Sequence, residues 1–302
     1  MTAMRRRASI PGIDRAATGE LAVLHPFRAA PAGGAGDLLF SRWIASLQPW
    51  TLGLLVMVAA LWPAASFAQG GYTAAQAMDA LWRWLPLLIT KGFALNILIS
   101  FFTMLIGTIA GVALGLGQIS LIRPVRVFAI WTTQLFRNSP WLVLLFIVML
   151  AFPFKIDLGF AVISIPDWIK AVFGLSLPIM ANISEIVRGA VRSVPSGQWE
   201  AAESLAYSRS QTLWQIILPQ CFKRMIPPWM NWYAILTMAT PLVSLLGVEE
   251  IITLSRQAME AEDNHPELLI PFFGFALLIF FAYCYPIARM TIALEKRFAV
   301  KL

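Results

Sequence analysis

Long stretches without charged residues occupy most of the chain, and they predict membrane-spanning helices. A helix needs about 20 apolar residues to cross the hydrocarbon of a bilayer, and six stretches meet this requirement. They cover residues 43–78, 92–122, 127–154, 168–189, 225–248 and 268–288. Arg137 interrupts the third stretch, and the fourth carries Glu185 and Arg188 near its end. Because no ten-residue alternation of apolar and polar positions appears, the pattern predicts an all-α membrane protein.

The composition excludes several soluble classes. Hydrophobic residues make up 59% of the 302 positions and charged residues only 13%, with a mean hydropathy of +0.71. Soluble domains contain about a quarter charged residues, so an ordinary cytosolic enzyme, a disordered protein and a nucleic-acid-binding module are excluded. Cys221 and Cys284 lack the spacing of a metal site or a disulfide framework, and His25 and His265 are isolated. We therefore expect no catalytic residue, metal or cofactor in this chain.

The distribution of Lys and Arg sets the expected orientation. If the N-terminus is cytoplasmic and six helices follow, 17 of the 23 basic residues lie inside, five lie outside, and Arg137 lies within a span. Basic residues accumulate in the cytoplasmic loops of membrane proteins, which favours this orientation. The acidic loop 249–267 is then expected outside.

The first 70 residues divide into two segments. Residues 1–42 are basic and contain a Pro, Gly and Ala-rich stretch, so they are expected to form a disordered cytoplasmic tail. Residues 43–70 are expected to form an extra N-terminal transmembrane helix. Ser66 and Ala68 also resemble a signal-peptidase site, so a cleaved signal sequence is an alternative. The 49 residues before the apolar run are long for a signal peptide, which favours a retained helix.

The stretch 190–224 is the longest polar segment on the expected cytoplasmic side, and it predicts a helix–turn–helix. Ser196 and Ser208 are each placed to cap a short helix, and Pro219 ends the second run. A helix lying on lipid headgroups would carry Lys and Arg on its polar face. The first of these helices instead carries Glu200 and Glu203 and no basic residue. Its small side chains form a surface that another protein can approach closely.

The same segment resembles the EAA signature of ABC importer permeases. That signature reads Glu-Ala-Ala, three residues, Gly, nine residues, Ile, one residue and Leu-Pro. The matching residues are Glu200, Ala201, Ala202, Ile216, Leu218 and Pro219, and Ala206 stands where the family has Gly. Residues 136–143, 185–189 and 193–202 also resemble the polar amino-acid branch of that family. The resemblance extends from Leu85 to the C-terminus.

This resemblance implies a type I ABC importer permease. Its five-helix core would occupy residues 85–302, with the coupling loop at 190–224, and the extra N-terminal helix would precede it. In such importers the coupling helices dock on a dimer of separate ATPase subunits, which bind ATP and Mg. A second permease subunit, identical or paralogous, completes the path. A periplasmic binding protein delivers the amino acid, and the helices alternate between outward and inward access.

The resemblance also implies a location in a bacterial inner membrane, surrounded by the lipid bilayer, and no nucleic-acid partner. The sequence contains no Gly-x-x-x-x-Gly-Lys-Ser/Thr phosphate loop. The chain is therefore not expected to be an enzyme, because its ATP chemistry would come from the ATPase partner.

Charges within the spans are candidates for a translocation path or gate, because a charge in hydrocarbon usually faces a cavity or a partner. Arg137 is followed by Asn138 in a helix-interrupting segment, which favours a path or gate role for this region. Glu185 and Arg188 either belong to the path or form an intrahelical ion pair at i,i+3 spacing.

Two other sets of residues lie on single helix faces. Thr240 and Ser244, four residues apart, either line the path or bond to the helix backbone. Gly107, Gly111 and Gly115 recur every four residues and predict a smooth groove for close helix packing. That packing lies either within the subunit or across a permease dimer.

Three alternatives remain open at the level of the sequence. A secondary transporter or channel would keep the intramembrane charges but has no use for the docking loop. An intramembrane enzyme would need clustered His, Asp or Cys residues within the spans, and the sequence has no such cluster. An ABC permease for another small polar solute would share every feature described above, and the sequence does not identify which amino acid is carried.

Overall fold

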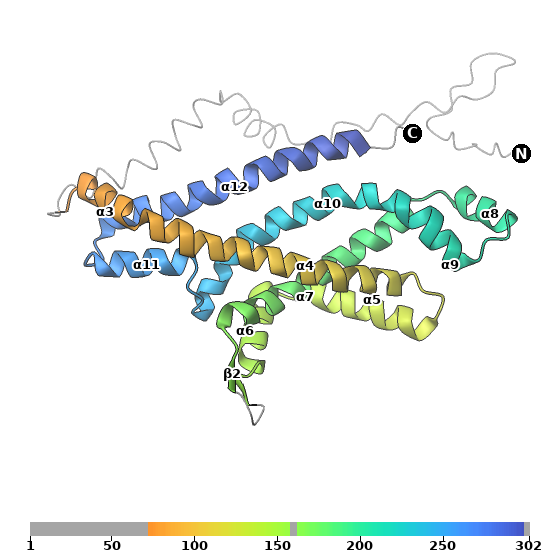
Figure 1. Cartoon of the computed structure of the whole chain (residues 1–302), viewed down its shortest axis with the longest axis horizontal. Helices are drawn as coiled ribbons and strands as arrows, with labels where there is room; N and C mark the ends of the chain where they lie inside the picture. The colour runs from red at the N-terminus through yellow and green to blue at the C-terminus, as the bar shows by residue number, and fades with distance from the viewer. Residues whose placement is uncertain (1–71, 158–161, 299–302) are drawn as a thin grey trace, which may run out of the picture. The chain divides into compact units, whose positions relative to one another are not determined.

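The computed structural model describes residues 72–157 and 162–298, which belong to one compact unit. Almost all of these residues are helical (Figure 1), which confirms the all-α membrane fold class. The helices are α3 (Ala74–Leu87), η1 (Leu88–Phe93), α4 (Ala94–Gln118), α5 (Arg123–Arg137), α6 (Trp141–Ala151), α7 (Asp167–Arg192), α8 (Ser196–Ser204), α9 (Arg209–Gln211), η2 (Thr212–Ile217), α10 (Leu218–Ala239), η3 (Thr240–Leu246), α11 (Ile251–Ala261), η4 (Pro266–Leu268) and α12 (Leu269–Phe298). A two-stranded antiparallel ladder, β1 (Lys155–Asp157) and β2 (Val162–Ser164), connects α6 to α7.

Five of the six charge-free stretches lie within the described residues, and the first lies almost wholly outside them. Within the described residues, three helical segments are long and apolar enough to cross a membrane, or five if each of two bent pairs counts as one span. The predicted tail 1–42 and the predicted extra helix 43–70 lie outside the described residues. The five-plus-one arrangement therefore stays a prediction.

The first described span is much longer than predicted. α3, η1 and α4 form one helical segment, Ala74–Gln118, of 45 residues. At a rise of 1.5 Å per residue it extends about 68 Å, roughly twice the thickness of the hydrocarbon. Most of the predicted span 92–122 lies in α4, and the helical backbone also extends upstream of it through Arg83 and Lys91.

The third predicted span, 127–154, is not straight. α5 and α6 are bent by 104° at the break between them. Pro140 has no N–H and adopts an extended backbone before α6. The last carbonyls of α5 are satisfied by side chains of the break: Asn138 Nδ2 donates to Gln134 O at 2.8 Å, and Ser139 Oγ donates to Leu135 O at 2.7 Å. The break is therefore a defined turn between two helices, stabilised by its own hydrogen bonds, and not a kink within one helix.

α7 is the least apolar of the three long spans and also the most enclosed. In its most apolar part 67% of the residues are buried inside the protein, whereas the corresponding parts of Ala74–Gln118 and Pro266–Phe298 are 33% and 22% buried. α4, α5, α6 and α10 all contact it. Because protein rather than lipid surrounds α7, polar side chains are tolerated along it, which explains its weak hydropathy signal.

The C-terminal part contains a helix that the sequence analysis missed. The expected acidic loop 249–267 includes α11, which packs against η1 and α12. Ile251, Leu254 and Ala258 lie on one face of α11 and are buried in a core cluster. The Glu250 side chain caps the helix by accepting from the N–H groups of Ile252 and Thr253. The high charge of the loop concealed this short apolar face.

Candidate functional site

The segment that resembles the EAA loop folds as two short helical pieces at one end of α7 and α10 (Figure 1). α8 begins at Ser196, and Pro195 takes the N-cap position with no side-chain cap bond, so the predicted cap by Ser196 was wrong. Ser208 caps the second helix as predicted, because its Oγ accepts from the Gln211 N–H while Gln211 Oε1 accepts from the Ser208 N–H. The helix–turn–helix expected from the sequence is present.

Direct contacts attach this loop to the ends of the long helices. Gln220 Nε2 donates to Gln198 Oε1 at 2.7 Å, which links α8 to α10. Arg224 Nη1 donates to Ser193 O at 3.0 Å and to Ser193 Oγ at 2.8 Å, which links α10 to the end of α7. α8 is therefore bonded to α10, and α10 in turn to the end of α7.

The EAA residues point in different directions. Glu200 and Ala201 are exposed, whereas Ala202 is only 2% exposed and faces its own chain. The expectation that Ala202 offers a surface to a partner was wrong, because α8 needs one apolar face against the rest of the protein. Ile216 and Leu218 are half-buried against a cluster that includes Cys221.

The backbone at Ala206 and at Pro219 differs from what the sequence pattern predicted. Ala206 has φ +60°, a left-handed backbone that glycine adopts without steric cost, which accounts for the glycine of the signature. Pro219 does not end the second run, because the helix continues through it into α10. The π-helical turn η2 precedes Pro219, and Pro219 occupies the first turn of α10.

Three large apolar side chains are exposed on the same loop: Leu205 at 73%, Trp214 at 60% and Tyr207 at 39%. The same loop carries the exposed carboxylate of Glu200 and the small, exposed side chain of Ala201. A surface that combines exposed apolar groups with a charge is typical of a protein-docking site.

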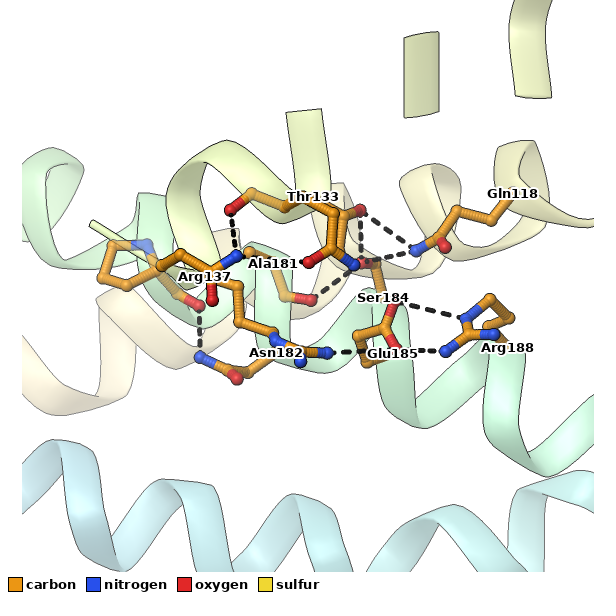
Figure 2. Close-up of polar contacts among 11 residues, drawn as sticks. Gln118, Thr133, Arg137, Ala181, Asn182, Ser184, Glu185 and Arg188 are labelled. Carbon is orange, nitrogen blue, oxygen red and sulfur yellow. Dashed lines mark hydrogen bonds and ion pairs between the residues drawn. The ribbon is translucent and has the colours of Figure 1, made fainter. Parts of the chain in front are cut away.

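The intramembrane charges form one cluster between α5 and α7 (Figure 2). Glu185 accepts from Arg188 at i,i+3 spacing, with Nε and Oε1 3.2 Å apart, and its Oε2 lies 3.2 Å from Nη1 of Arg137. The Glu185 side chain is 15% exposed and that of Arg137 is 40% exposed. The intrahelical pair considered from the sequence is therefore present, and it shares its carboxylate with a second helix.

A polar network that the sequence analysis missed adjoins this cluster (Figure 2). Gln118 Nε2 donates to Thr133 Oγ1 at 3.0 Å and to Ser184 Oγ at 3.1 Å, and the two hydroxyls lie 2.9 Å apart. All three side chains are buried and come from α4, α5 and α7. Gln118 follows an apolar stretch, whereas Thr133 and Ser184 have polar neighbours in the sequence, so no sequence pattern indicated that these three side chains meet.

The three glycines of α4 lie against α7 within the same subunit. A Cβ atom would lie 2.5 Å from Ile179 Cγ2 at Gly107, 2.7 Å from Met180 O at Gly111 and 2.8 Å from Ser184 O at Gly115. Close approach of the two helices is therefore what brings Gln118 and Ser184 together.

Comparison with known proteins assigns the family. Residues 104–299 match the family described as "Binding-protein-dependent transport system inner membrane component". The chain belongs to this family. The match includes α5, α7 and the whole EAA segment, so the charge cluster and the loop lie in the part of this permease that defines it. The family is a transport component of the inner membrane and not a catalytic enzyme.

Individual relatives cover most of the permease. It is 34% identical to "Probable amino-acid ABC transporter permease protein YckA" of Bacillus subtilis, over 70% of this chain and 89% of that protein. It is 31% identical to "L-cystine transport system permease protein TcyB" of the same organism, over 70% of this chain and 86% of that protein. A solved structure described as "an amino acid ABC transporter with histidines" shares its fold, with 23% identity, a TM-score of 0.61 and coverage of 72% of this chain and 96% of that one.

The hydroxyl groups predicted near the path occupy different environments in the permease. Thr240 is fully buried, donates to Thr237 O at 2.8 Å and accepts from Asn96 Nδ2 at 2.9 Å. Ser244, one turn later, is half-buried. Thr240 therefore bonds to the backbone and to α4, which is the structural alternative considered from the sequence. Asn138 likewise caps α5, since its Nδ2 donates to Gln134 O and Oε1.

Asn96 and Glu250 form a second buried polar site that the sequence analysis did not select. Both are fully buried, and Asn96 Nδ2 donates to Glu250 Oε2 at 3.0 Å. Asn96 Oδ1 also accepts from the Ile251 N–H at 3.2 Å. The pair fixes the start of α11 against α4.

Proposed function

We propose that this chain is the membrane-spanning permease of an ATP-driven importer that carries polar amino acids across a bacterial inner membrane. The relatives with the highest similarity reported above are described as amino-acid and L-cystine permeases, which supports the cargo class. The observation that carries the proposal is α8 itself, which is bonded to α10 through Gln198 and Gln220 and has Glu200 and Ala201 exposed. No observation favours a secondary transporter, which has no use for such a loop.

Coupling follows from the attachment of α8. A separate ATPase dimer, which binds ATP and Mg, docks on Glu200, Ala201 and the exposed apolar residues of the loop. Closure of that dimer moves α8, and the bonds from Gln198 to Gln220 and from Ser193 to Arg224 carry the movement into α10 and α7. A periplasmic binding protein delivers the amino acid to the outer side, and a second permease subunit completes the path.

The charge cluster supplies a gate in this scheme. Arg137 ends α5 directly before the turn at 138–140, and it is 40% exposed while still paired with Glu185. A partly solvated guanidinium can exchange one carboxylate for another, because both partners remain accessible to water. We propose that Arg137 exchanges the carboxylate of Glu185 for that of the amino acid during transport.

Purification from native membranes tests the assembly. We expect mass spectrometry of the affinity-purified chain to identify an ABC ATPase and an extracytoplasmic binding protein. Reconstitution of these components in vesicles should then give amino-acid uptake that requires ATP and the binding protein. Purification of the chain without an ATPase, together with uptake driven by an ion gradient alone, would refute the proposal. A binding protein that retains a different polar solute would refute only the cargo.

A further inference from the structure

A pocket of about 480 Å³ opens beside α8, at the ends of α5 and α7. Three arginines from three elements line it: Arg126 of α5, Arg192 of α7 and Arg209 of α9. Among the residues that the structure describes, no Asp or Glu lines this pocket, and none of the three guanidinium groups forms an ion pair. The pocket therefore contains three positive charges without a counter-ion.

Two of the arginines are held in place by neutral groups. Arg126 Nη1 donates to Ser120 O at 3.1 Å, and the Arg209 guanidinium lies over the Trp199 ring, 5.1 Å from its centroid. A guanidinium carries five N–H donors in a planar fork, so these contacts orient the side chains and leave most donors available. Preoriented arginines of this kind suit an oxyanion.

The N-terminus of α8 adds a second, independent anion-binding element. α8 has nine residues, its first turn contains no acidic residue, and no side chain caps its N-terminus. Ser196, the first residue of the helix, lines the pocket. A Cβ atom at Gly197 would meet nothing within 4 Å, so the backbone is open there. The Gln198 N–H already donates to Pro195 O at 3.1 Å, so the N–H groups of Ser196 and Gly197 and the helix dipole are what favour an anion at this terminus.

We propose that this pocket binds a phosphate group. Three guanidinium groups and an uncapped helix N-terminus provide several donors and positive charge for a tetrahedral oxyanion, and the volume lies in the range of small-ligand sites. The phosphate belongs either to the headgroup of an anionic phospholipid or to a free phosphate compound of the cytoplasm. Basic pockets at the cytoplasmic ends of membrane helices are known to take lipid headgroups.

A bound phosphate would connect α5, α7 and α9 to the start of α8. This consequence rests on the proposed function, because α8 is the helix to which the ATPase docks. Glu200 and Ala201 lie on the exposed face of α8, whereas Trp199 lines the pocket. Phosphate therefore holds the first turn of α8 in place, one helical turn before Glu200.

Thermal unfolding of the purified full-length chain in non-ionic detergent tests the site directly. The probes are dioctanoyl phosphatidylglycerol, inorganic phosphate and, as the neutral-headgroup control, dioctanoyl phosphatidylcholine. We expect phosphatidylglycerol or phosphate to raise the unfolding midpoint saturably, because a ligand of the native state stabilises it, and phosphatidylcholine to have no effect. Arg126→Gln and Arg192→Gln should each raise the apparent Kd about tenfold, as expected for loss of one charge-assisted contact.

Arg123→Gln is the matched control, because Arg123 is exposed, lies three residues before Arg126 in α5 and does not line the pocket. Arg192→Gln is included because Arg126→Gln also removes the bond from Arg126 to Ser120 O and could act through that local change alone. Stabilisation by phosphatidylglycerol alone identifies a lipid headgroup, and stabilisation by inorganic phosphate identifies a free phosphate compound; both support the site. Saturable binding of neither anionic probe, or equal affinity in the Arg123, Arg126 and Arg192 variants, would overturn it. Since neither ATPase nor uptake enters the measurement, this failure is distinct from failure of the proposed function.

Discussion

The contact between α4 and α7 predicts that Gly111→Ala destabilises the permease. The added Cβ would lie 2.7 Å from Met180 O and 2.7 Å from Ile183 Cβ. Non-bonded contacts between heavy atoms are optimal at about 3.5–4.0 Å, so relief of the clash requires the two helices to separate by roughly 1 Å. One of the obstructing atoms is a backbone carbonyl of α7, which cannot rotate away as a flexible side chain can.

The expected magnitude combines two opposing effects. Overpacking of a close contact costs about 1–3 kcal/mol, while alanine in place of glycine in a helix contributes about 1 kcal/mol of stability. We expect a net loss of up to about 2 kcal/mol. Gly189→Ala in α7 is the matched control, because a Cβ there meets nothing within 4 Å and only the favourable helix contribution remains. The difference between the two variants then isolates the packing cost.

Tryptophan fluorescence during thermal unfolding in detergent measures this difference. For chains of this size a change of 1 kcal/mol shifts the midpoint by about 2–4 °C, so Gly111→Ala should unfold several degrees below Gly189→Ala. Gln118 and Ser184 should also lose their direct bond as the helices separate, and uptake should fall. Equal midpoints for the two variants would show that α4 and α7 do not approach as closely as described.

Three further predictions concern the loop and the gate. Glu200→Lys reverses an exposed charge on α8, so we expect normal membrane insertion but weaker ATPase binding. ATP hydrolysis stimulated by the binding protein should be lost in reconstituted vesicles. Wild-type hydrolysis and uptake would exclude α8 as the coupling element. Ala206→Gly removes the steric strain of an alanine with a left-handed backbone, φ +60°, and should increase the free energy of unfolding by about 1 kcal/mol. A variant less stable than the wild type would show that Ala206 is not strained. Arg137→Leu should reduce uptake without changing the amount of assembled complex on native gels, because this side chain is 40% exposed; full uptake would leave Arg137 with a structural role only.

Much of the permease could be predicted because the relevant information is local in the sequence. Charge-free stretches predicted a membrane protein, and the short spaced motif from Glu200 to Pro219 predicted the family that the comparisons confirm. The Ser208 cap was also predictable, since capping depends on residues three positions apart. Even the i,i+3 pair of Glu185 and Arg188 follows from helix geometry alone.

The predictions that were wrong concern features that depend on which helix surfaces pack against each other. Charge marked the limits of the apolar stretches, but helices continue through Arg83 and Lys91, and α11 lies within an acidic segment. Burial of Ala202 depends on the face that α8 presents to the rest of the chain. A pattern along the chain carries no information on these choices, because each is decided by a neighbour distant in sequence.

The sequence by itself therefore determined the class, the family and the place of the EAA segment, since hydrophobic runs, short motifs and capping are properties of nearby residues. Only the tertiary structure decided that Glu185 pairs with Arg137 across α5 and α7, and that Arg126, Arg192 and Arg209 surround one pocket. The physical reason is that ion pairs and pockets require side chains from separate helices to meet. Their meeting is set by close packing, such as that of the α4 glycines on α7, which brings together residues more than 60 positions apart.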